Sequence, residues 1–422
     1  MATFSAKERL IASVLSATPR LKKFIKTAYI RLNAMIYAKE KGYKILDARI
    51  KNIEYVIGHN NEESFFGYYD KSPMCNNITL SHIATSPTCK DPKTNAPIKI
   101  VISDLETGKN RIIGETTSYT WQQGARAQWL DEDTLMYNIA GDNKYQAVAY
   151  SISKGTNVKI FDKPVQDSYG KKFFLSLNYS RLMPIAPDYG YRNFPASIKN
   201  QPEHCNDGIW KINYETGEEV LLHSLEDILK CNWNDEFKNS YHTINHIMIS
   251  PDGKGFIFIH RYYKGQQRFH RLIYSNFREL KVLLENEMVS HMCWLNNETV
   301  FGYISVGRKN GYYSIDIESS KSTLCKEMTD TNLGDGHPSV YGDWIVFDCY
   351  PDKSRMQQLL LFNNKTKEII PLLKLYQSVK YMYDTRCDLH PRFSKDGKHI
   401  YFDTVFSGKR THCRINVQKI IK

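Results

Sequence analysis

Four histidines occupy one comparable position in separate stretches of this 422-residue chain. The comparison starts from two similar runs, residues 245–258 and 389–402, each typical of a strand, a tight Asp-Gly turn and a second strand. In both runs a histidine lies four residues before the turn serine, and the same offset recurs in two further stretches. The four residues are His246, His291, His337 and His390. Imidazole titrates near neutral pH and binds metals readily, so such a set could transfer protons or hold a metal ion.

Other polar residues occur at or near the same repeat position. Tyr68 and Arg126 have the histidine offset in the first two repeats, and Asp388 lies two residues before His390, where a strand would turn both to one side. Candidates for binding a substrate are Tyr68, Asp70, Trp121, Gln123, Arg261 and Arg386. We predict that His246 or His337 acts as a base and that Arg126 or Arg268 binds a carboxylate. A structural role for the repeated histidines, and a surface-loop role for the other residues, are the alternatives.

Short strands separated by turns make up the chain from about residue 50 onward. A second recurring unit, seen in residues 101–108 and again in 211–217, resembles the outer hairpin of a propeller blade. Such internal repeats favour a propeller over a sandwich or barrel, with a solenoid as the main alternative. Helical patterns in this part are short and lie near Leu225–Lys230 and Leu372–Val379.

The repeats predict an all-β, seven-bladed β-propeller over residues 46–422. The expected blades lie near 64–115, 125–162, 172–223, 243–285, 289–327, 336–373 and 388–417. The last blade has three clear strands, so Asn52–Ile57 would supply a fourth and close the ring, which removes an open sheet edge. Because the innermost strands of a propeller line its channel, the four histidines are expected to converge at one mouth.

Residues 1–45 form a separate basic segment. Residues 1–41 hold nine Lys and Arg against Glu8 and Glu40, while the whole chain has a net charge of +12. Thr18-Pro19 is typical of a helix start, and apolar residues follow at helical spacing. This basic amphipathic helix could bind an anionic membrane surface. Packing against the propeller is the second interpretation, and a nucleic-acid arm is the third.

Motifs that the sequence lacks bear on the location of the protein and on the classes of enzyme it could belong to. No secretory signal and no apolar run long enough to span a bilayer is recognisable, and the nine cysteines include no CxxC pair. We therefore expect a cytoplasmic protein, peripheral on the inner membrane if the helix binds lipid. The chain has no phosphate-binding loop, dinucleotide fingerprint or nucleophile elbow, and no recognition motif for nucleic acid.

Several of these motifs resemble the propellers of oligogalacturonate lyases and the broader TolB-like repeats. The matching stretches are residues 257–261 with Arg268, 290–294, and 390–397 with Phe402 and Gly408. The resemblance implies manganese-dependent β-elimination on uronic-acid glycans. It also implies that His291 and His390 bind the metal. Asp388 stands where the family has another histidine, and Thr385 stands where it has a glutamine. A His-Asp-His set could still hold manganese or another divalent ion.

Gly67–Pro73 together with the basic helix also resembles uncharacterised propellers associated with bacterial surface-polysaccharide synthesis. That resemblance implies work on a lipid-linked or nascent glycan at the inner leaflet. Our leading hypothesis is thus an enzyme that acts on an acidic or lipid-linked saccharide. A polysaccharide-biosynthesis transferase and a non-catalytic scaffold that binds glycan or protein are the alternatives.

Overall fold

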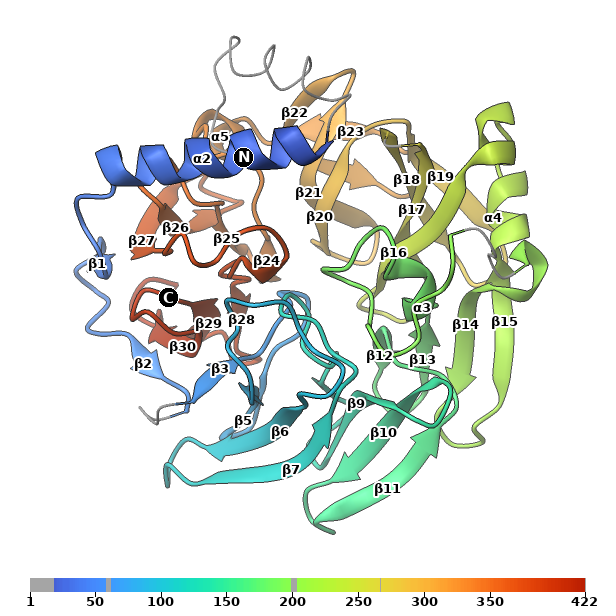
Figure 1. The fold of residues 1–422 in the computed structure, drawn as a ribbon, viewed down its shortest axis with the longest axis horizontal. Coiled ribbons are helices and arrows are strands. Elements are labelled where there is room, and N and C mark those ends of the chain that lie inside the picture. Colours follow the sequence, from blue (N-terminus) through green and yellow to red (C-terminus); the bar gives the residue numbers. More distant parts are fainter. Residues whose placement is uncertain (1–18, 58–61, 199–202, 266, 422) are drawn as a thin grey trace.

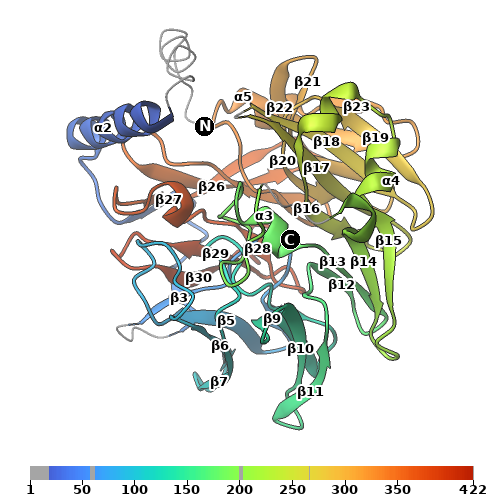
Figure 2. The ribbon, with the colours of Figure 1, turned by 45° about the vertical axis from the view of Figure 1, so that its right-hand side comes forward.

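Seven antiparallel sheets surround a central axis in the computed structural model of the chain (Figure 1). The structure describes residues 19–57, 62–198, 203–265 and 267–421. The sheets follow one another in sequence order around the ring, and a view turned by 45° shows the same arrangement obliquely (Figure 2). The predicted seven-bladed β-propeller is confirmed.

Each blade is built outward from an innermost strand at the axis. Blades one to three contain β3 (Glu63–Phe65), β4 (Met74–Cys75), β5 (Ile78–Ala84), β6 (Ile98–Asp104) and β7 (Asn110–Thr116); β8 (Gln128–Trp129), β9 (Thr134–Ala140), β10 (Tyr145–Ser151) and β11 (Thr156–Phe161); and β12 (Asp167–Tyr169), β13 (Phe173–Ser176), β14 (Gly208–Asn213) and β15 (Glu219–Ser224). The innermost strand of blade three, β12, therefore precedes the start predicted for that blade.

The second half of the ring has the same order. Blades four to seven contain β16 (Tyr241–Ile249), β17 (Phe256–Lys264), β18 (Gln267–Ser275) and β19 (Leu280–Glu285); β20 (Val289–Trp294), β21 (Thr299–Val306), β22 (Lys309–Asp316) and β23 (Ser322–Leu324); β24 (Ser339–Tyr341), β25 (Trp344–Asp348), β26 (Met356–Asn363) and β27 (Ile369–Tyr376); and β28 (Arg392–Phe393), β29 (His399–Thr404) and β30 (Thr411–Asn416).

Two short strands near the beginning of the chain complete the last two sheets. Strand β2 (Glu54–Tyr55) pairs with β30 and gives blade seven its fourth strand, as predicted. Strand β1 (Tyr43–Ile45) pairs with β27 as a fifth strand of blade six, although the sequence placed these residues in the helical segment. The predicted helix at Leu372–Val379 is wrong, because most of it lies in β27 between β1 and β26.

Few helices accompany the sheets. They are α2 (Pro19–Tyr37), α3 (Tyr179–Leu182), α4 (Leu225–Lys230) and α5 (Lys326–Asp330), with 3-10 turns η2 (His204–Asn206), η3 (Asp235–Asn239) and η4 (Tyr383–Thr385). The helix predicted at Leu225–Lys230 is confirmed, and Ser224 and Asp227 form a capping box at its start. Helix α2 lies across one face of the disc over blade six (Figure 1). Residues 1–18, including the predicted cap Thr18, lie outside the described part.

No described helix is both long and apolar enough to cross a bilayer.

The innermost strands are interrupted at one level of the axis. In blade one, β3 and β4 both pair with β5, and residues 66–73 leave the strand between them. Register shifts in blades four and five fall between Asn245 and Met248 and between Val289 and Met292. Bulges of this kind re-aim side chains, and here each one carries a tyrosine or histidine of the predicted site.

The second strands of four blades carry a polar residue near the inner level, and each bonds the backbone of the next blade. His82 of β5 accepts from the Ala125 N–H at 3.3 Å, and Asn138 of β9 accepts from the Val165 N–H at 2.7 Å. Asp348 of β25 accepts from the His390 N–H at 3.2 Å. These bonds satisfy backbone groups that the interrupted strands leave without a ladder partner.

Asp403 of β29 is the fourth of these polar residues and joins blade seven to blade one. Its carboxylate accepts from the Phe66 and Gly67 N–H groups at 2.9 and 2.8 Å and from Arg392 Nη2 at 3.1 Å. Gly67 has φ of +113°, and a Cβ there would lie 2.6 Å from the carbonyl carbon of Gln123, so no larger residue fits. The chain therefore turns toward the axis at a fixed point.

We expect Asp403→Asn to lower the free energy of unfolding by about 3 to 5 kcal/mol, because it leaves the buried Arg392 guanidinium without a counter-ion. Urea unfolding followed by tryptophan fluorescence measures this change. The matched variant Asp142→Asn alters an exposed turn residue and should stay within about 0.5 kcal/mol of wild type. Equal midpoints for the two variants would contradict the role given to Asp403.

Candidate active site at the propeller hub

The four repeated histidines meet at the axis. Ring centroids lie 5.9 Å apart for His246 and His291, 3.9 Å for His291 and His337, and 4.3 Å for His337 and His390. All four side chains are buried, with at most 4% of each residue exposed. The equivalent strand positions thus produce one imidazole cluster, and the histidines do not lie in separate blade interiors.

Two of these histidines, together with Arg126, share an unusual backbone conformation. Arg126, His246 and His390 have φ of 54°, 53° and 44°, in the left-handed region that residues with a Cβ seldom adopt. Such a conformation costs roughly 1 to 3 kcal/mol per residue and tends to occur at functional sites. Three blades therefore use the same left-handed backbone conformation at this repeat position.

Segment 66–70 brings two tyrosines into the histidine cluster. The Tyr68 hydroxyl lies 2.5 Å from His246 Nδ1, and the Tyr69 hydroxyl donates to the Met292 carbonyl at 2.8 Å. The ring of Tyr68 contacts those of His246, His291 and His390, and the ring of Tyr69 contacts His337. Burial raises the pKa of both phenols well above 10, so both keep their protons at neutral pH.

Three side chains of the cluster could hold a metal ion. Ligand atoms of His337, Asp388 and His390 all lie within 4.8 Å of one another, and all three residues are buried. Two imidazoles and a carboxylate suit divalent transition metals such as manganese or zinc. Asp388 and His390 are also the ligands that the sequence predicts. His337, predicted as a candidate base, completes this set, and the predicted ligand His291 has its ring centroid 3.9 Å from that of His337.

Two carboxylates that the sequence analysis did not single out orient the histidines. His337 Nδ1 lies 2.9 Å from Asp348 Oδ1, and His291 Nδ1 lies 3.3 Å from Asp335 Oδ1. A carboxylate on one ring nitrogen leaves the other free as a ligand, which is the usual support of a metal-binding histidine. The sequence does contain a signal for Asp348, because Ile345–Asp348 and Ile400–Asp403 are similar runs that end in a carboxylate.

Burial and neighbouring charges shift the pKa values of these histidines in different directions. Burial lowers the pKa of His246 and His390 well below 6.5, and other cationic groups lower it further. Burial acts in the same direction on His337, but the carboxylate of Asp348 outweighs it and the pKa is raised. At neutral pH, His246 and His390 are therefore uncharged and can accept a proton or bind a metal.

Two of the predicted substrate-binding arginines are already paired. Arg126 donates to Asp70 Oδ1 and Oδ2 at 3.0 and 2.7 Å, and Arg386 binds both oxygens of Asp388 at 2.5 and 2.6 Å. Asp70 therefore neutralises the charge of Arg126 inside the protein, and a substrate carboxylate would have to compete with it. The other predicted carboxylate-binding residue, Arg268, is exposed on β18, the third strand from the axis and away from the cluster.

Arg261 is the arginine that the structure leaves available. Its residue is only 5% exposed, yet within the described part of the chain its guanidinium has no hydrogen-bond or ion-pair partner. Its charge lowers the pKa of both His246 and Tyr68. Asp188 interacts electrostatically with Arg261 but forms no ion pair with it among the described contacts. A buried cation without an ion-pair partner is costly, so this position is poised for an anion.

Two other predicted substrate contacts differ in their surroundings. Trp121 is 1% exposed, packs edge-on against Phe65, and donates from Nε1 to the Lys90 carbonyl at 2.7 Å. This burial leaves little of the indole accessible to the substrate that the sequence predicts it to bind. Gln123 is also buried, but neither atom of its side-chain amide has a partner among the described residues, so it remains a candidate.

An insertion between β13 and β14 of blade three borders the cluster. The ring of Tyr189 packs edge-on against that of His246, with 4.9 Å between their centroids. The carboxyl group of Asp188 interacts electrostatically with Arg261 and Arg386. Burial raises the pKa of Asp188, and the charge of Asp384 raises it further. Asp188, Tyr189 and Arg386 are partly exposed, so this side connects the buried cluster to solvent. Asp188 and Tyr189 carry no signal in the sequence because they lie outside the repeats.

Comparison with solved structures places the fold among known propellers. An oligogalacturonate lyase from Vibrio parahaemolyticus has a TM-score of 0.59 at 13% identity, with 91% of this chain and 100% of that chain covered. An oligogalacturonate lyase in complex with manganese has a TM-score of 0.57 at 12% identity, with coverages of 89% and 98%. TolB from Acinetobacter baumannii has a TM-score of 0.38 at 13% identity, with coverages of 71% and 63%.

The likeness to the two oligogalacturonate lyases concerns the fold of the chain. The chain is a seven-bladed β-propeller that resembles the oligogalacturonate lyases, as the motifs had suggested. No family model matches the sequence, and no curated protein matches it. At 12–13% identity the shared property is the fold, so activity has to be argued from the side chains at the hub.

We expect the protein to bind one Mn²⁺ ion, and His390→Ala to weaken that binding at least about a hundredfold. Asp348→Asn removes the charge beside His337 Nδ1 and alters the acceptor of the His390 N–H, and it should cost about 10- to 100-fold. Isothermal titration of metal-stripped protein measures both effects. The control His399→Ala changes a partly buried histidine of β29 outside the cluster and should bind like wild type. Equal affinities for all four proteins would rule out the proposed ligands.

Proposed function

We propose that this propeller is a metal-dependent enzyme that acts on an acidic saccharide by lyase-like β-elimination. The observation that carries the proposal is the convergence of His337, Asp388 and His390 beside the unpaired Arg261 and the Tyr68–His246 pair. These groups correspond to a cation site, a carboxylate site and an acid–base pair. The likeness in fold to two oligogalacturonate lyases supports the choice of reaction.

His337, Asp388 and His390 would hold the divalent ion, with Asp348 fixing the ring of His337. When bound, the ion supplies positive charge that stabilises the negative charge developing on the substrate. Arg386 shares Asp388 with this site and keeps its carboxylate ionised, since burial alone would raise the pKa of Asp388.

Arg261 would bind the carboxylate of the sugar. A guanidinium can donate two parallel hydrogen bonds to a carboxylate, and a buried site makes them stronger than in water. The neighbouring Tyr189 presents an aromatic ring at the partly exposed side of the cluster, where a sugar ring would lie. In this arrangement the carbon next to the carboxylate would lie close to His246.

His246 and Tyr68 would divide the proton transfers. Elimination removes the proton from the carbon beside the carboxylate, breaks the bond to the glycosidic oxygen at the next carbon, and leaves a carbon–carbon double bond. Neutral His246 accepts the first proton, and Tyr68, whose pKa is raised, donates its proton to the departing oxygen. Proton transfer across the 2.5 Å contact between them then restores both groups.

We expect the protein with Mn²⁺ to cleave oligogalacturonate or a related uronate oligosaccharide, with a rise in ultraviolet absorbance from the new conjugated double bond. His246→Ala should lower kcat at least about a hundredfold, because a general base contributes that much or more. A screen in which wild type cleaves none of several uronate polymers, with metal bound, would overturn the proposed reaction.

Arg261→Ala should raise KM for the acidic substrate about 10- to 100-fold, as expected for loss of hydrogen bonds to a charged group. Arg261→Lys should recover only part of this loss, because an ammonium cannot reproduce the paired geometry. Arg268→Ala is the matched control and should leave KM unchanged, since Arg268 is exposed away from the cluster. A larger effect at Arg268 than at Arg261 would contradict the assignment.

The pH dependence of kcat/KM should reflect the lowered pKa of His246. A base works only in its uncharged form, so the rate should hold as pH falls through 6.5 and decline only at lower pH. The measurement uses saturating Mn²⁺ and a thermal-shift control for folding at each pH. An acid limb centred above pH 6.5 would show that another group is the base.

A further inference from the structure

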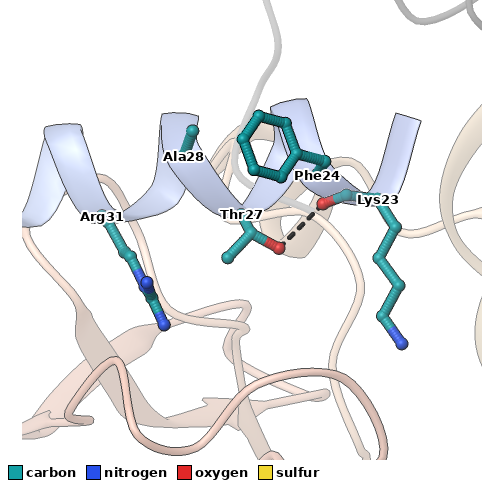
Figure 3. A pocket seen from close by; sticks show the side chains of 5 residues that line it. All are labelled: Lys23, Phe24, Thr27, Ala28 and Arg31. Carbon is teal, nitrogen blue, oxygen red and sulfur yellow. Dashed lines mark hydrogen bonds between the residues drawn. The ribbon is translucent and has the colours of Figure 1, made fainter. Parts of the chain in front are cut away.

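The described contacts that attach helix α2 to the propeller come from one side of the helix, at Lys23, Lys26 and Thr27. The Thr27 hydroxyl lies 2.7 Å from the Tyr383 hydroxyl, which also donates to the Lys23 carbonyl at 3.2 Å. The ammonium groups of Lys23 and Lys26 lie 5.0 and 5.6 Å from the Tyr383 ring centroid. In Figure 3 the side chains of Lys23, Thr27 and Arg31 extend to the same side of the helix.

The other side of α2 exposes an uninterrupted apolar surface. At about 100° per residue, seven apolar residues fall within an arc of roughly 120° that begins about 60° from Thr27. They are Leu21, Phe24, Ile25, Ala28, Leu32, Met35 and Ile36, and all are exposed. The exposed fraction reaches 71% for Phe24 and 84% for Met35. Soluble surfaces seldom leave so large an apolar stripe uncovered, so it indicates a binding surface.

Positive charge borders this stripe. Residues 19–37 contain five Lys and Arg and no Asp or Glu. Arg31 lies at one edge of the arc, and a hollow of about 460 Å³ along the helix is lined by Lys23, Phe24, Thr27, Ala28 and Arg31 (Figure 3). An apolar face with cations along its edge matches the boundary between lipid chains and anionic headgroups.

We propose that α2 docks the protein on an anionic lipid surface, with its apolar arc in the acyl boundary and its cations at the headgroups. A second copy of the chain is the less favourable occupant, because pairing two such helices would bring together ten positive charges without an acidic partner. This proposal goes beyond the proposed reaction and does not depend on it.

Docking through α2 would also orient the hub. Tyr383, which fastens the helix, begins η4 in the connection between β27 and β28. The same connection supplies Arg386, Asp388 and His390 to the site. The helix and the partly exposed Arg386 therefore belong to the same end of the channel, and this end would face the lipid headgroups.

Vesicle co-sedimentation of the full chain tests the proposal, with phosphatidylcholine vesicles with and without phosphatidylglycerol. We expect binding to the anionic vesicles at least tenfold stronger than to the neutral ones. Leu32→Glu/Met35→Glu should abolish binding, and Arg31→Ala should weaken it about fivefold, the usual effect of one cation near an anionic surface. All three positions are exposed, so folding should be unaffected.

The matched control is Ile160→Glu, which removes a 57% exposed apolar side chain from the outer strand β11 and should bind vesicles like wild type. Two results would overturn the proposal. The first is wild-type protein that does not sediment with anionic vesicles. The second is a dimer, seen by light scattering, that dissociates in the variant Leu32→Glu/Met35→Glu. This result would show that a second copy of the chain covers the apolar arc.

Discussion

Two buried ion pairs hold one short segment across the propeller axis, and the candidate site depends on them. Asp403, itself paired with Arg392, fixes the backbone at Gly67, and Asp70 at the other end of the segment binds Arg126. Between these ends Tyr68 and Tyr69 lie among the four histidines. Breaking either buried pair would leave an uncompensated charge, so the segment has little freedom to leave the channel. The imidazoles consequently pack against rigid aromatic rings.

Charge balance at the hub explains which side chains are available for chemistry. The described carboxylates Asp70, Asp335, Asp348 and Asp388 each contact an arginine or a histidine. Burial disfavours protonation of His246 and His390, whereas Asp348 favours it for His337. Arg261 is the exception, because its buried guanidinium has no hydrogen bond or ion pair with a described residue, and Asp188 acts on it only through its charge. The same balance that stabilises the fold therefore leaves a place for one anion.

The architecture and the convergence of the histidines followed from local sequence patterns. Turn residues mark the strands, and a ring of equivalent strands brings equivalent positions to one axis, so His246, His291, His337 and His390 could be placed together. The pairing of Arg126 with Asp70 could not be foreseen, because it depends on how residues 66–73 leave their strand. The burial of Trp121 could not be foreseen for a similar reason, since local sequence does not reveal whether an aromatic residue faces solvent or Phe65. Asp335 and Tyr189 lie in connections that carry no repeat signal.

The closing sheet also sets the order in which the molecule can be completed during synthesis. Blade seven joins β2 to strands that begin at Arg392, so the ring stays open until those later residues have left the ribosome. Tyr68 is made more than 300 residues before Asp388 and His390. At typical elongation rates it waits roughly 15 to 60 s for these neighbours. Six blades can thus assemble while the hub is still incomplete, and a truncated nascent chain would lack the centre on which the chemistry depends.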